Sequence, residues 1–425
     1  MLDKPQRIDI YSDPRKPAYL NFEAGAAPLK NPVPEGTINA ARAHRHKRMK
    51  DEVIKQDCAA ILLYDPLNIR YATDCSDMQV WTLHNPSRYV LLFADGPTIC
   101  FEYKQAMHLA EGLDMVDEVR PSISWFYFSA GPRCEERANL WADEIADLMR
   151  QHGGGNMRLA IDKIEPLGLD ALRARGVEDI EGQQITEQAR RNKCEADLIL
   201  MDWTIKVCEA GMWRMRENSV AGKTENEIWA ELHYENIRNG GEWIETRLLS
   251  IGERTNPWFQ ECSNHRGVDG DLLSFDTDLV GPYGYCADLS RSWTIGLVPP
   301  TDEQKRLYEN AYNQIMHNKD VIQPGMSFHE FNDKSWRVPE EFWALRYSVA
   351  LHGVGLCDEY PSVPTHIDMD NGGGYKGQFE VGDVLCVESC TGVEGGRECI
   401  KLEIQVLVTE DGTRQLDEFP FEDWV

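Results

Sequence analysis

Several acidic residues in the C-terminal half of the chain stand at positions that favour metal binding. Asp276 and Asp278 are two residues apart in the segment LLSFDTDLVGPYGYCADLSRSW, and Asp288 follows them beyond a G-P-Y-G turn. Residues two apart on a β-strand point to one face, so a hairpin would bring Asp288 back beside the pair. Three ionised carboxylates at close quarters repel one another unless a cation lies among them.

Three further residues extend this set of candidate ligands. Glu388 ends the apolar segment DVLCVE, Glu403 lies within IKLEIQVLV, and His352 opens HGVGLCDEYP. Any one of these acids alone is more often a surface residue, and a lone histidine is more often a core group, but ionised acids inside apolar strands are rarely tolerated unpaired. Oxygen-rich ligation with one imidazole suits a pair of divalent first-row ions such as Fe, Mn, Co or Zn. The six residues together predict a dinuclear metal centre.

The elements that must position these residues fall into two groups, which predict a two-domain α+β protein. Residues 1–36 are rich in Pro, Gly and charge, and we interpret them as an irregular arm. Residues 37–184 alternate helical and apolar strand patterns, including a hairpin around a DG turn at 89–102, as in an α/β domain. Residues 185–425 contain the candidate site. Its expected helices cover 187–219, 224–241, 302–320 and 328–336, and its expected strands cover 271–280, 284–295, 384–390 and 400–409.

Composition limits the classes of partner. The 425 residues carry a net charge of −27, which disfavours nucleic acid and anionic membranes because both attract clustered Lys and Arg. The twelve cysteines include no CxxC pair, which indicates reduced thiols and a cytoplasmic protein. The first residues lack the apolar run of a signal peptide, and no stretch reaches the ~18 apolar residues of a spanning helix.

The order of these motifs resembles that of a known superfamily. The series D-x-D…GPYGYCADLSRSW, HGVG, GDVLCVES and KLE is similar to the pita-bread enzymes, which include methionine aminopeptidase, prolidase and creatinase. The resemblance implies a pita-bread catalytic domain over residues 185–425 with a dinuclear metal site. It also implies, more weakly, a creatinase/prolidase-like α/β domain before it.

The same resemblance implies a role for each ligand. Asp288 and Glu403 would bridge two divalent ions, and His352 and Glu388 would complete the coordination of one of them. Asp278, together with Asp276, would complete the other. The superfamily's usual spacing between its two aspartates falls between the ten and twelve residues that separate these candidates from Asp288. Which of the two is the main ligand therefore stays open.

Departures from the peptidase pattern change the expected chemistry. Peptidases of the superfamily carry a second histidine where HGVGLCDEYP places Asp358, and another where this chain has Trp258 and Phe259; His265 lies too close to the strand to replace it. Peptide hydrolysis is therefore disfavoured. A carboxylate beside two Lewis acids can instead remove a proton from the carbon next to a metal-bound carboxylate. Asp358 is the candidate base, although an acid that only supports a ligand or caps the next turn would fit the same position.

This combination resembles one branch of the superfamily, the metallopeptidase-like dimethylsulfoniopropionate (DMSP) lyases of the DddP type. The resemblance implies elimination of dimethyl sulfide from DMSP to leave acrylate, with Asp358 as base, iron as the metal, and a homodimer. The substrate is a small zwitterion whose sulfonium an aromatic face could hold by cation–π attraction. We expect Tyr347 to form that face. Trp81 is a second candidate, reaching a neighbouring subunit's site, although plain core packing would explain both residues.

Two other functions remain open from the sequence. One is a metallohydrolase, either an Xaa-Pro dipeptidase or a creatinase-like enzyme, against which the missing histidines count. The other is a pseudo-enzyme that keeps the fold as a binding module. Such proteins usually lose metal ligands, whereas here every ligand position is filled.

Overall fold

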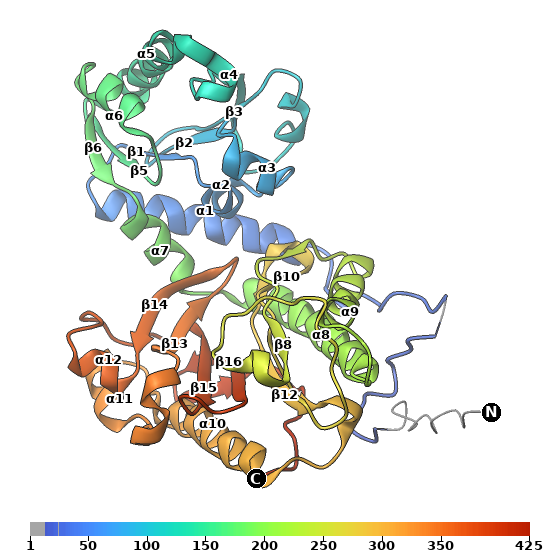
Figure 1. Ribbon diagram of the computed structural model, residues 1–425. Coiled ribbons are helices and arrows are strands. Elements are labelled where there is room, and N and C mark those ends of the chain that lie inside the picture. The colour runs from blue at the N-terminus through green and yellow to red at the C-terminus, as the bar shows by residue number, and fades with distance from the viewer. Residues whose placement is uncertain (1–12, 24) are drawn as a thin grey trace. The chain divides into compact units, whose positions relative to one another are not determined.

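The computed structural model describes residues 13–23 and 25–425, which form two compact units (Figure 1). One unit comprises residues 36–190, and the other comprises residues 191–425 with the segment that precedes residue 36. The expected arm falls partly on residues 1–12 and 24, outside the described residues. Its described part contacts the C-terminal unit of its own chain: the Leu29 amide donates to Asn239 Oδ1 at 2.7 Å, and Arg15 Nη1 donates to the Phe421 carbonyl at 3.0 Å.

The N-terminal unit is built on a six-stranded mixed sheet in the order β4-β3-β2-β1-β5-β6. Its strands are β1 Ala60–Leu63, β2 Tyr89–Phe93, β3 Thr98–Glu102, β4 Glu118–Pro121, β5 Arg158–Ile161 and β6 Glu178–Glu181. Its helices are α1 Thr37–Lys55, α2 Pro66–Thr73, α3 Gln79–His84, α4 Tyr127–Ala130, α5 Cys134–His152, α6 Pro166–Arg173 and α7 Gln183–Arg191. The expected hairpin is present, since β2 and β3 pair antiparallel across the turn that contains Asp95 and Gly96.

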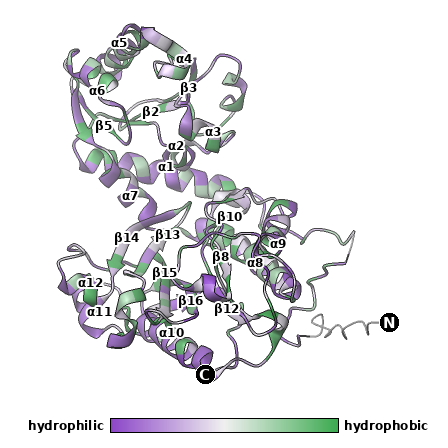
Figure 2. Ribbon diagram, in the orientation of Figure 1, coloured by the Kyte–Doolittle hydropathy of each residue, from purple (hydrophilic) through white to green (hydrophobic). Residues whose placement is uncertain are grey.

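Helix α1 packs into this unit although most of its residues are polar. Figure 2 shows it as mostly hydrophilic, yet Ala41, Arg45, Met49 and Val53 are buried at four-residue intervals and form one stripe. Arg45 can be buried within that stripe because its guanidinium pairs with Asp74 at 3.2 Å. This buried stripe at helical spacing accounts for the helix although its apolar residues are few.

The C-terminal unit contains an eight-stranded sheet and a three-stranded sheet. The larger sheet has the order β14-β13-β15-β16-β12-β9-β8, with β17 also paired to β16, and the smaller has the order β11-β10-β7. The strands are β7 Trp243–Ile244, β8 Leu249–Ile251, β9 Leu272–Asp276, β10 Leu279–Val280, β11 Cys286–Ala287, β12 Ser290–Thr294, β13 Val349–Val354, β14 Asp358–Pro364, β15 Val384–Gly392, β16 Cys399–Thr409 and β17 Gly412–Gln415. The helices are α8 Glu195–Asn218, α9 Glu225–Arg238, α10 Asp302–Val321, α11 Phe328–Lys334 and α12 His366–Asp370.

The two central strands of the larger sheet are buried along almost their whole length. All residues of β15 and all but the last of β16 are buried. Apolar side chains of α10, such as Leu307 and Ile315, share a core with Leu385 and Ile404 of these strands. A polar side chain on β15 or β16 must therefore find its partner inside the protein.

Two expected strands are each divided in the structure. The pattern over 271–280 predicts one strand, but β9 ends at Asp276 in the larger sheet, and β10 begins at Leu279 in the smaller one. Asp278 lies at this break with φ 36°. The expected strand over 284–295 divides in the same way into β11 and β12. The hairpin passes from one sheet to the other, so the assumption of an unbroken strand was wrong there.

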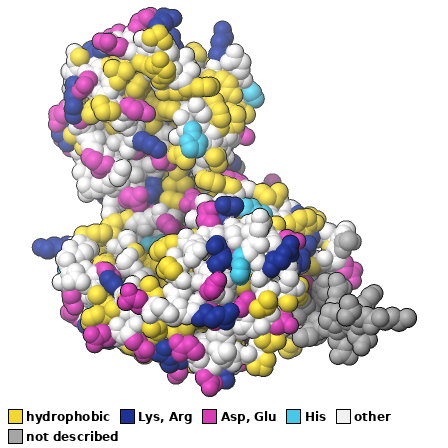
Figure 3. Space-filling view, viewed as in Figure 1, with side chains coloured by type: hydrophobic (Ala, Val, Ile, Leu, Met, Phe, Trp, Pro, Cys, Tyr) yellow, Lys and Arg dark blue, Asp and Glu magenta, His cyan; other side chains and the backbone are white. Residues whose placement is uncertain are grey.

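The apolar length of the helices and the distribution of surface charge bear on membrane and nucleic-acid binding. None of the helices that the structure describes combines the length and the apolar character needed to cross a bilayer. A nucleic-acid surface would gather Lys and Arg into one area. On the face drawn in Figure 3, acidic and basic side chains are instead interspersed.

Candidate metal centre

Three adjacent strands place the candidate histidine and glutamates on one face of the larger sheet. Glu388 on β15 is the direct cross-strand partner of Glu403 on β16, and His352 on β13 is the partner of Cys386 on β15. Cys386 and Glu388 are two residues apart on one strand, so their side chains point to the same face. The sheet order β13-β15-β16 therefore brings three candidate ligands together.

The divided hairpin supplies the aspartates. The register that pairs Asp276 with Ser290 places Asp278 opposite Asp288, and the Asp278 amide donates to Asp288 Oδ1 at 3.3 Å. Ser290 is also paired with Glu403 of β16. Its hydroxyl lies 2.7 Å from Asp276 Oδ1 and 2.9 Å from Glu403 Oε2. The hairpin thus adds its carboxylates beside those of β15 and β16.

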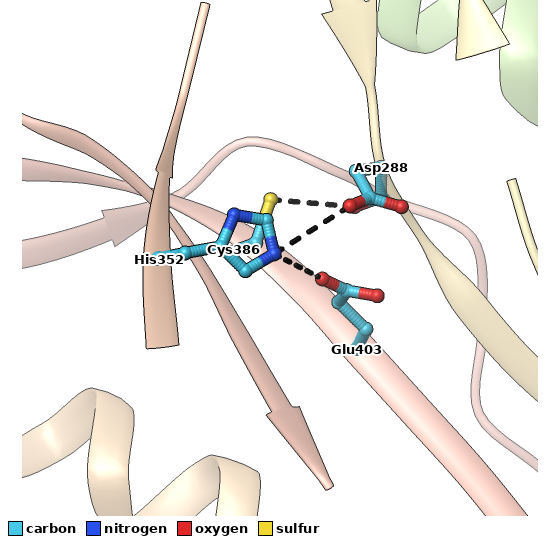
Figure 4. Close-up of side chains that lie close together, drawn as sticks. All are labelled: Asp288, His352, Cys386 and Glu403. Atoms are coloured by element: carbon cyan, nitrogen blue, oxygen red, sulfur yellow. Dashed lines mark hydrogen bonds and ion pairs between the residues drawn. The ribbon is translucent and has the colours of Figure 1, made fainter. Parts of the chain in front are cut away.

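His352 lies among these carboxylates. Its Nε2 is 3.6 Å from Asp288 Oδ2, 3.6 Å from Glu388 Oε1 and 3.4 Å from Glu403 Oε1. Figure 4 shows the ring facing Asp288 and Glu403, with the Cys386 thiol beside it. His352 Nδ1 is 3.0 Å from the Gly353 carbonyl, to which a proton on that nitrogen would donate. That tautomer leaves Nε2 free as a ligand atom.

The donor set fits divalent cations. Oε1 of Glu388 and Oε1 of Glu403 are buried and have no hydrogen-bond partner among the described residues. The candidate ligand atoms form three overlapping groups, each within 4.8 Å: Asp276, Glu388 and Glu403; Asp288, His352, Cys386 and Glu403; Asp278, Asp288 and Asp358. Asp288 and Glu403 each belong to two groups, so each could be shared by two adjacent ions. Buried, unpartnered carboxylate oxygens beside one imidazole suit a pair of first-row divalent ions.

The protonation of this cluster reflects its burial. Burial raises the pKa of Asp278 and that of Glu388 to about 8, and the charges of Asp276 and Glu403 act in the same direction. Burial and the charge of Glu403 hold the pKa of Asp288 well above its usual range. Without metal ions the site therefore retains protons, which bound cations would displace.

Lys401 is a member of the site that sequence reasoning missed. Its ammonium is fully buried and lies 2.9 Å from Asp276 Oδ2, 3.0 Å from Glu388 Oε2 and 2.9 Å from Glu403 Oε2. Burial raises the pKa of Glu403, but Lys401 and His352 outweigh it and hold that pKa below its usual value. The segment KLE contains a signal for this contact, because Lys401 and Glu403 are two residues apart and residues at that spacing on a strand share a face.

Asp358 differs from the other acids of the site in its exposure. It begins β14, its side chain is 50% exposed, and its Oδ1 lies 3.6 Å from His352 Nδ1. The side chains of Asp288, Glu388 and Glu403 are almost completely buried. Burial raises the pKa of Asp358, His352 opposes this, and Glu403 adds to it, so that the net shift is upward. Asp358 is thus a carboxylate with raised basicity that solvent can reach.

The two aromatic candidates lie in different units. Tyr347 is half-buried beside the site, with the Lys401 ammonium 5.0 Å from its ring centroid and the exposed Phe259 ring at 5.3 Å on centroids. Trp258 is buried against Tyr347 in a small cluster. Trp81 belongs to α3 of the N-terminal unit, where it is 42% exposed and 6.0 Å from the Tyr103 ring. The roles of Tyr347 and Trp81 stay predictions.

Comparison with known proteins gives the family. Residues 197–410 match the model of metallopeptidase family M24. The chain is 43% identical over 390 residues to dimethylsulfoniopropionate lyase DddP of Roseovarius nubinhibens, covering 91% of this chain and 87% of the relative. The DddP lyase of Roseobacter denitrificans is 42% identical with the same coverage. This chain belongs to the DddP family of DMSP lyases.

Solved structures confirm the predicted pita-bread fold for this DddP family member. An Xaa-Pro dipeptidase from Bacillus anthracis superimposes with a TM-score of 0.71 at 17% identity, covering 90% of this chain and 99% of the other. The prolidase from Pyrococcus horikoshii gives 0.69 at 19% identity, covering 89% and 99%. At these identities the likeness concerns the fold alone. The match to a metallopeptidase family implies divalent metal ions at the carboxylate cluster.

Proposed function

We propose that this protein is a metal-dependent lyase that cleaves DMSP into dimethyl sulfide and acrylate. The observation that carries the proposal is the half-exposed carboxylate of Asp358, 3.6 Å from a histidine that faces buried acids. Among the described residues, His352 is the one histidine in the groups of candidate ligands at this site. Such a site offers a carboxylate base. It lacks the additional histidines on which the expectation of peptide hydrolysis would depend.

The elimination follows from the chemistry of the substrate. Asp358 removes a proton from the carbon next to the substrate carboxylate, and the electron pair of that C–H bond forms the C=C bond. The C–S bond breaks, and its electron pair leaves with sulfur as neutral dimethyl sulfide. The raised pKa of Asp358 makes it a stronger base than an ordinary aspartate. Its exposure lets it return the proton to solvent before the next turnover.

The carboxylates and His352 would hold two divalent ions. We assign as ligands Asp276, Asp278, Asp288, His352, Glu388 and Glu403. Asp278 is favoured over Asp276 as the main ligand beside Asp288, because its carboxylate groups with that of Asp288, whereas the carboxylate of Asp276 groups with those of Glu388 and Glu403. When bound, the ions would supply electrophilic stabilisation of the charge that develops on the substrate carboxylate.

Three finer points belong to the same proposal. Iron is our proposed metal, with Zn, Mn and Co as alternatives. Tyr347 would face the sulfonium. A homodimer would let Trp81 approach the partner's site, which is supported by the exposure of Trp81 and its α3 neighbours Val80 and Leu83. A cytoplasmic location is supported by twelve cysteines that are all free thiols.

The deciding assay supplies DMSP to purified, metal-loaded protein. We expect dimethyl sulfide in the headspace and an equal amount of acrylate in solution. A parallel reaction with an Xaa-Pro dipeptide should show no hydrolysis. Dipeptide cleavage without dimethyl sulfide would overturn the proposal in favour of a hydrolase. Elemental analysis and light scattering of the same preparation test the metal and the dimer.

A further inference from the structure

Lys401 places a permanent positive charge inside the metal centre. Its ammonium is within 3.0 Å of three carboxylates that come from three different strands: Asp276 on β9, Glu388 on β15 and Glu403 on β16. Its fourth contact is the Ser290 hydroxyl at 3.0 Å. The lysine side chain has no exposed surface, so these contacts replace its hydration completely.

Lys401 contacts only one of the two carboxylate oxygens of each glutamate. Oε2 of Glu388 and Oε2 of Glu403 face the ammonium. Oε1 of each faces His352 Nε2, at 3.6 Å and 3.4 Å, and has no hydrogen-bond partner in the described part of the chain. Fixing one oxygen of a planar carboxylate restricts where the other can point. The ammonium thus presents the two free oxygens towards the histidine.

The charges of the site support the same role. The five candidate ligand carboxylates, when ionised, carry five negative charges, and Lys401 leaves a net charge of minus four. Two divalent cations match that charge. In the metal-free protein, Lys401 is the one Lys or Arg side chain paired with these five carboxylates among the residues that the structure describes.

We propose that Lys401 is a positioning residue of the metal centre: an internal cation that keeps Asp276, Glu388 and Glu403 in their ligand arrangement before any ion binds. The inference rests on the proposed metal-dependent function. It goes beyond that function in assigning part of the site's cationic charge to the protein itself. Without the ammonium, the three buried carboxylates lose their shared partner, and bound metal ions can supply the missing positive charge.

The test compares melting temperatures of Lys401→Met and the wild-type protein, each with and without saturating divalent metal. The metal-free variant should melt at least about 5 °C lower than the metal-free wild type, because a buried charge cluster has lost its cation. Metal should recover most of that loss. Lys401→Arg, which retains the charge, should stay close to wild type in both states, and elemental analysis should find two ions in it.

A matched control separates this role from ordinary burial of an ion pair. Lys193 has a buried side chain paired with Glu359, a carboxylate that belongs to none of the groups of candidate ligands. Lys193→Met should lower the melting temperature equally with and without metal. The proposal is overturned if metal does not restore the melting temperature that Lys401→Met has lost, as in this control. It is also overturned if metal-free Lys401→Met has the same melting temperature as the metal-free wild type.

The remaining outcomes are also decisive. If Lys401→Met folds only when metal is present during refolding, the proposal is supported. If both Lys401→Met and Lys401→Arg fail to fold, with metal and without it, the proposal is overturned. None of these measurements uses DMSP. A protein that shows the metal-dependent recovery but releases no dimethyl sulfide would refute the proposed substrate and leave the role of Lys401 standing.

Discussion

Replacing Asp358 by asparagine is the sharpest test of the proposed elimination. The change keeps the size of the side chain and removes the carboxylate that would accept the proton. A positioned general base contributes about 10²–10⁴-fold to a rate, which is about 2.7–5.4 kcal/mol of barrier. Neighbouring acids cannot replace it, because Asp278 and Asp288 are buried and belong to the candidate ligands. His352 Nδ1 already lies against the Gly353 carbonyl at 3.0 Å. Water can reach the position of the half-exposed side chain, so we expect a loss of about 10³-fold.

The assay must separate chemistry from binding and from metal loss. We expect kcat for dimethyl sulfide release to fall by that factor while KM stays within about threefold, because the base acts mainly in the transition state. Elemental analysis should find the wild-type metal content, and the melting temperature should stay near that of the wild type. Asp370→Asn is the matched control, since it removes an exposed aspartate at the end of α12. Its kinetics should be those of the wild type.

One result would refute the reasoning. If Asp358→Asn carries its full complement of metal and turns over DMSP within about threefold of the wild-type kcat, Asp358 is not the base. Its carboxylate would then only support His352. If the variant instead loses metal, the Asp278, Asp288 and Asp358 group includes Asp358 as a ligand, and the division of roles proposed above is wrong.

The other predictions concern metal binding, pH and substrate affinity. Glu403→Gln should lose at least one ion per chain, because Glu403 belongs to two ligand groups; two undiminished ions would contradict its assignment as a bridging ligand. In the metal-free protein, the pKa values of Asp278 and Glu388 are raised to about 8, so folding retains protons that the unfolded chain releases. The resulting stability is complete below about pH 4 and is lost as the pH rises towards 8, so calorimetry should show a melting temperature that falls from pH 6 to 8. Metal binding at pH 7 should release protons and flatten that dependence, which titration in two buffers of different ionisation enthalpy would show. Tyr347→Leu should raise KM for DMSP about two- to thirtyfold with Tyr347→Phe near wild type, and an unchanged KM in the leucine variant would exclude the ring from sulfonium binding.

The predicted site residues were accessible from the sequence because their positions are costly without a partner. Glu403 lies inside a buried apolar strand, and an ionised acid there requires a cation. Asp288 and His352 stand at turns and strand positions next to apolar runs, which marked them in the same way. The break at Asp278 was not predictable, because it arises where one hairpin passes between two sheets.

Lys401 shows the limit of the same reasoning. The spacing in KLE places Lys401 on the same face of the strand as Glu403, but it does not show which other groups meet that face. Its contacts with Asp276 and Glu388 come from strands that are 125 and 13 residues away in sequence. Only the assembled sheet shows that all three carboxylates converge on one ammonium.

The amino-acid sequence by itself determined which residues could do chemistry and which face of its own strand each one occupies. Alternation along a strand is a local property of the backbone, so the spacing of apolar and acidic residues is sufficient to predict it. The tertiary structure decided which faces meet. The order β13-β15-β16-β12-β9 depends on pairings between distant segments, and these pairings bring His352, Glu388, Glu403 and the hairpin aspartates close together. They also left Asp358 half-exposed at its edge, which gives it access to a substrate that the buried acids lack.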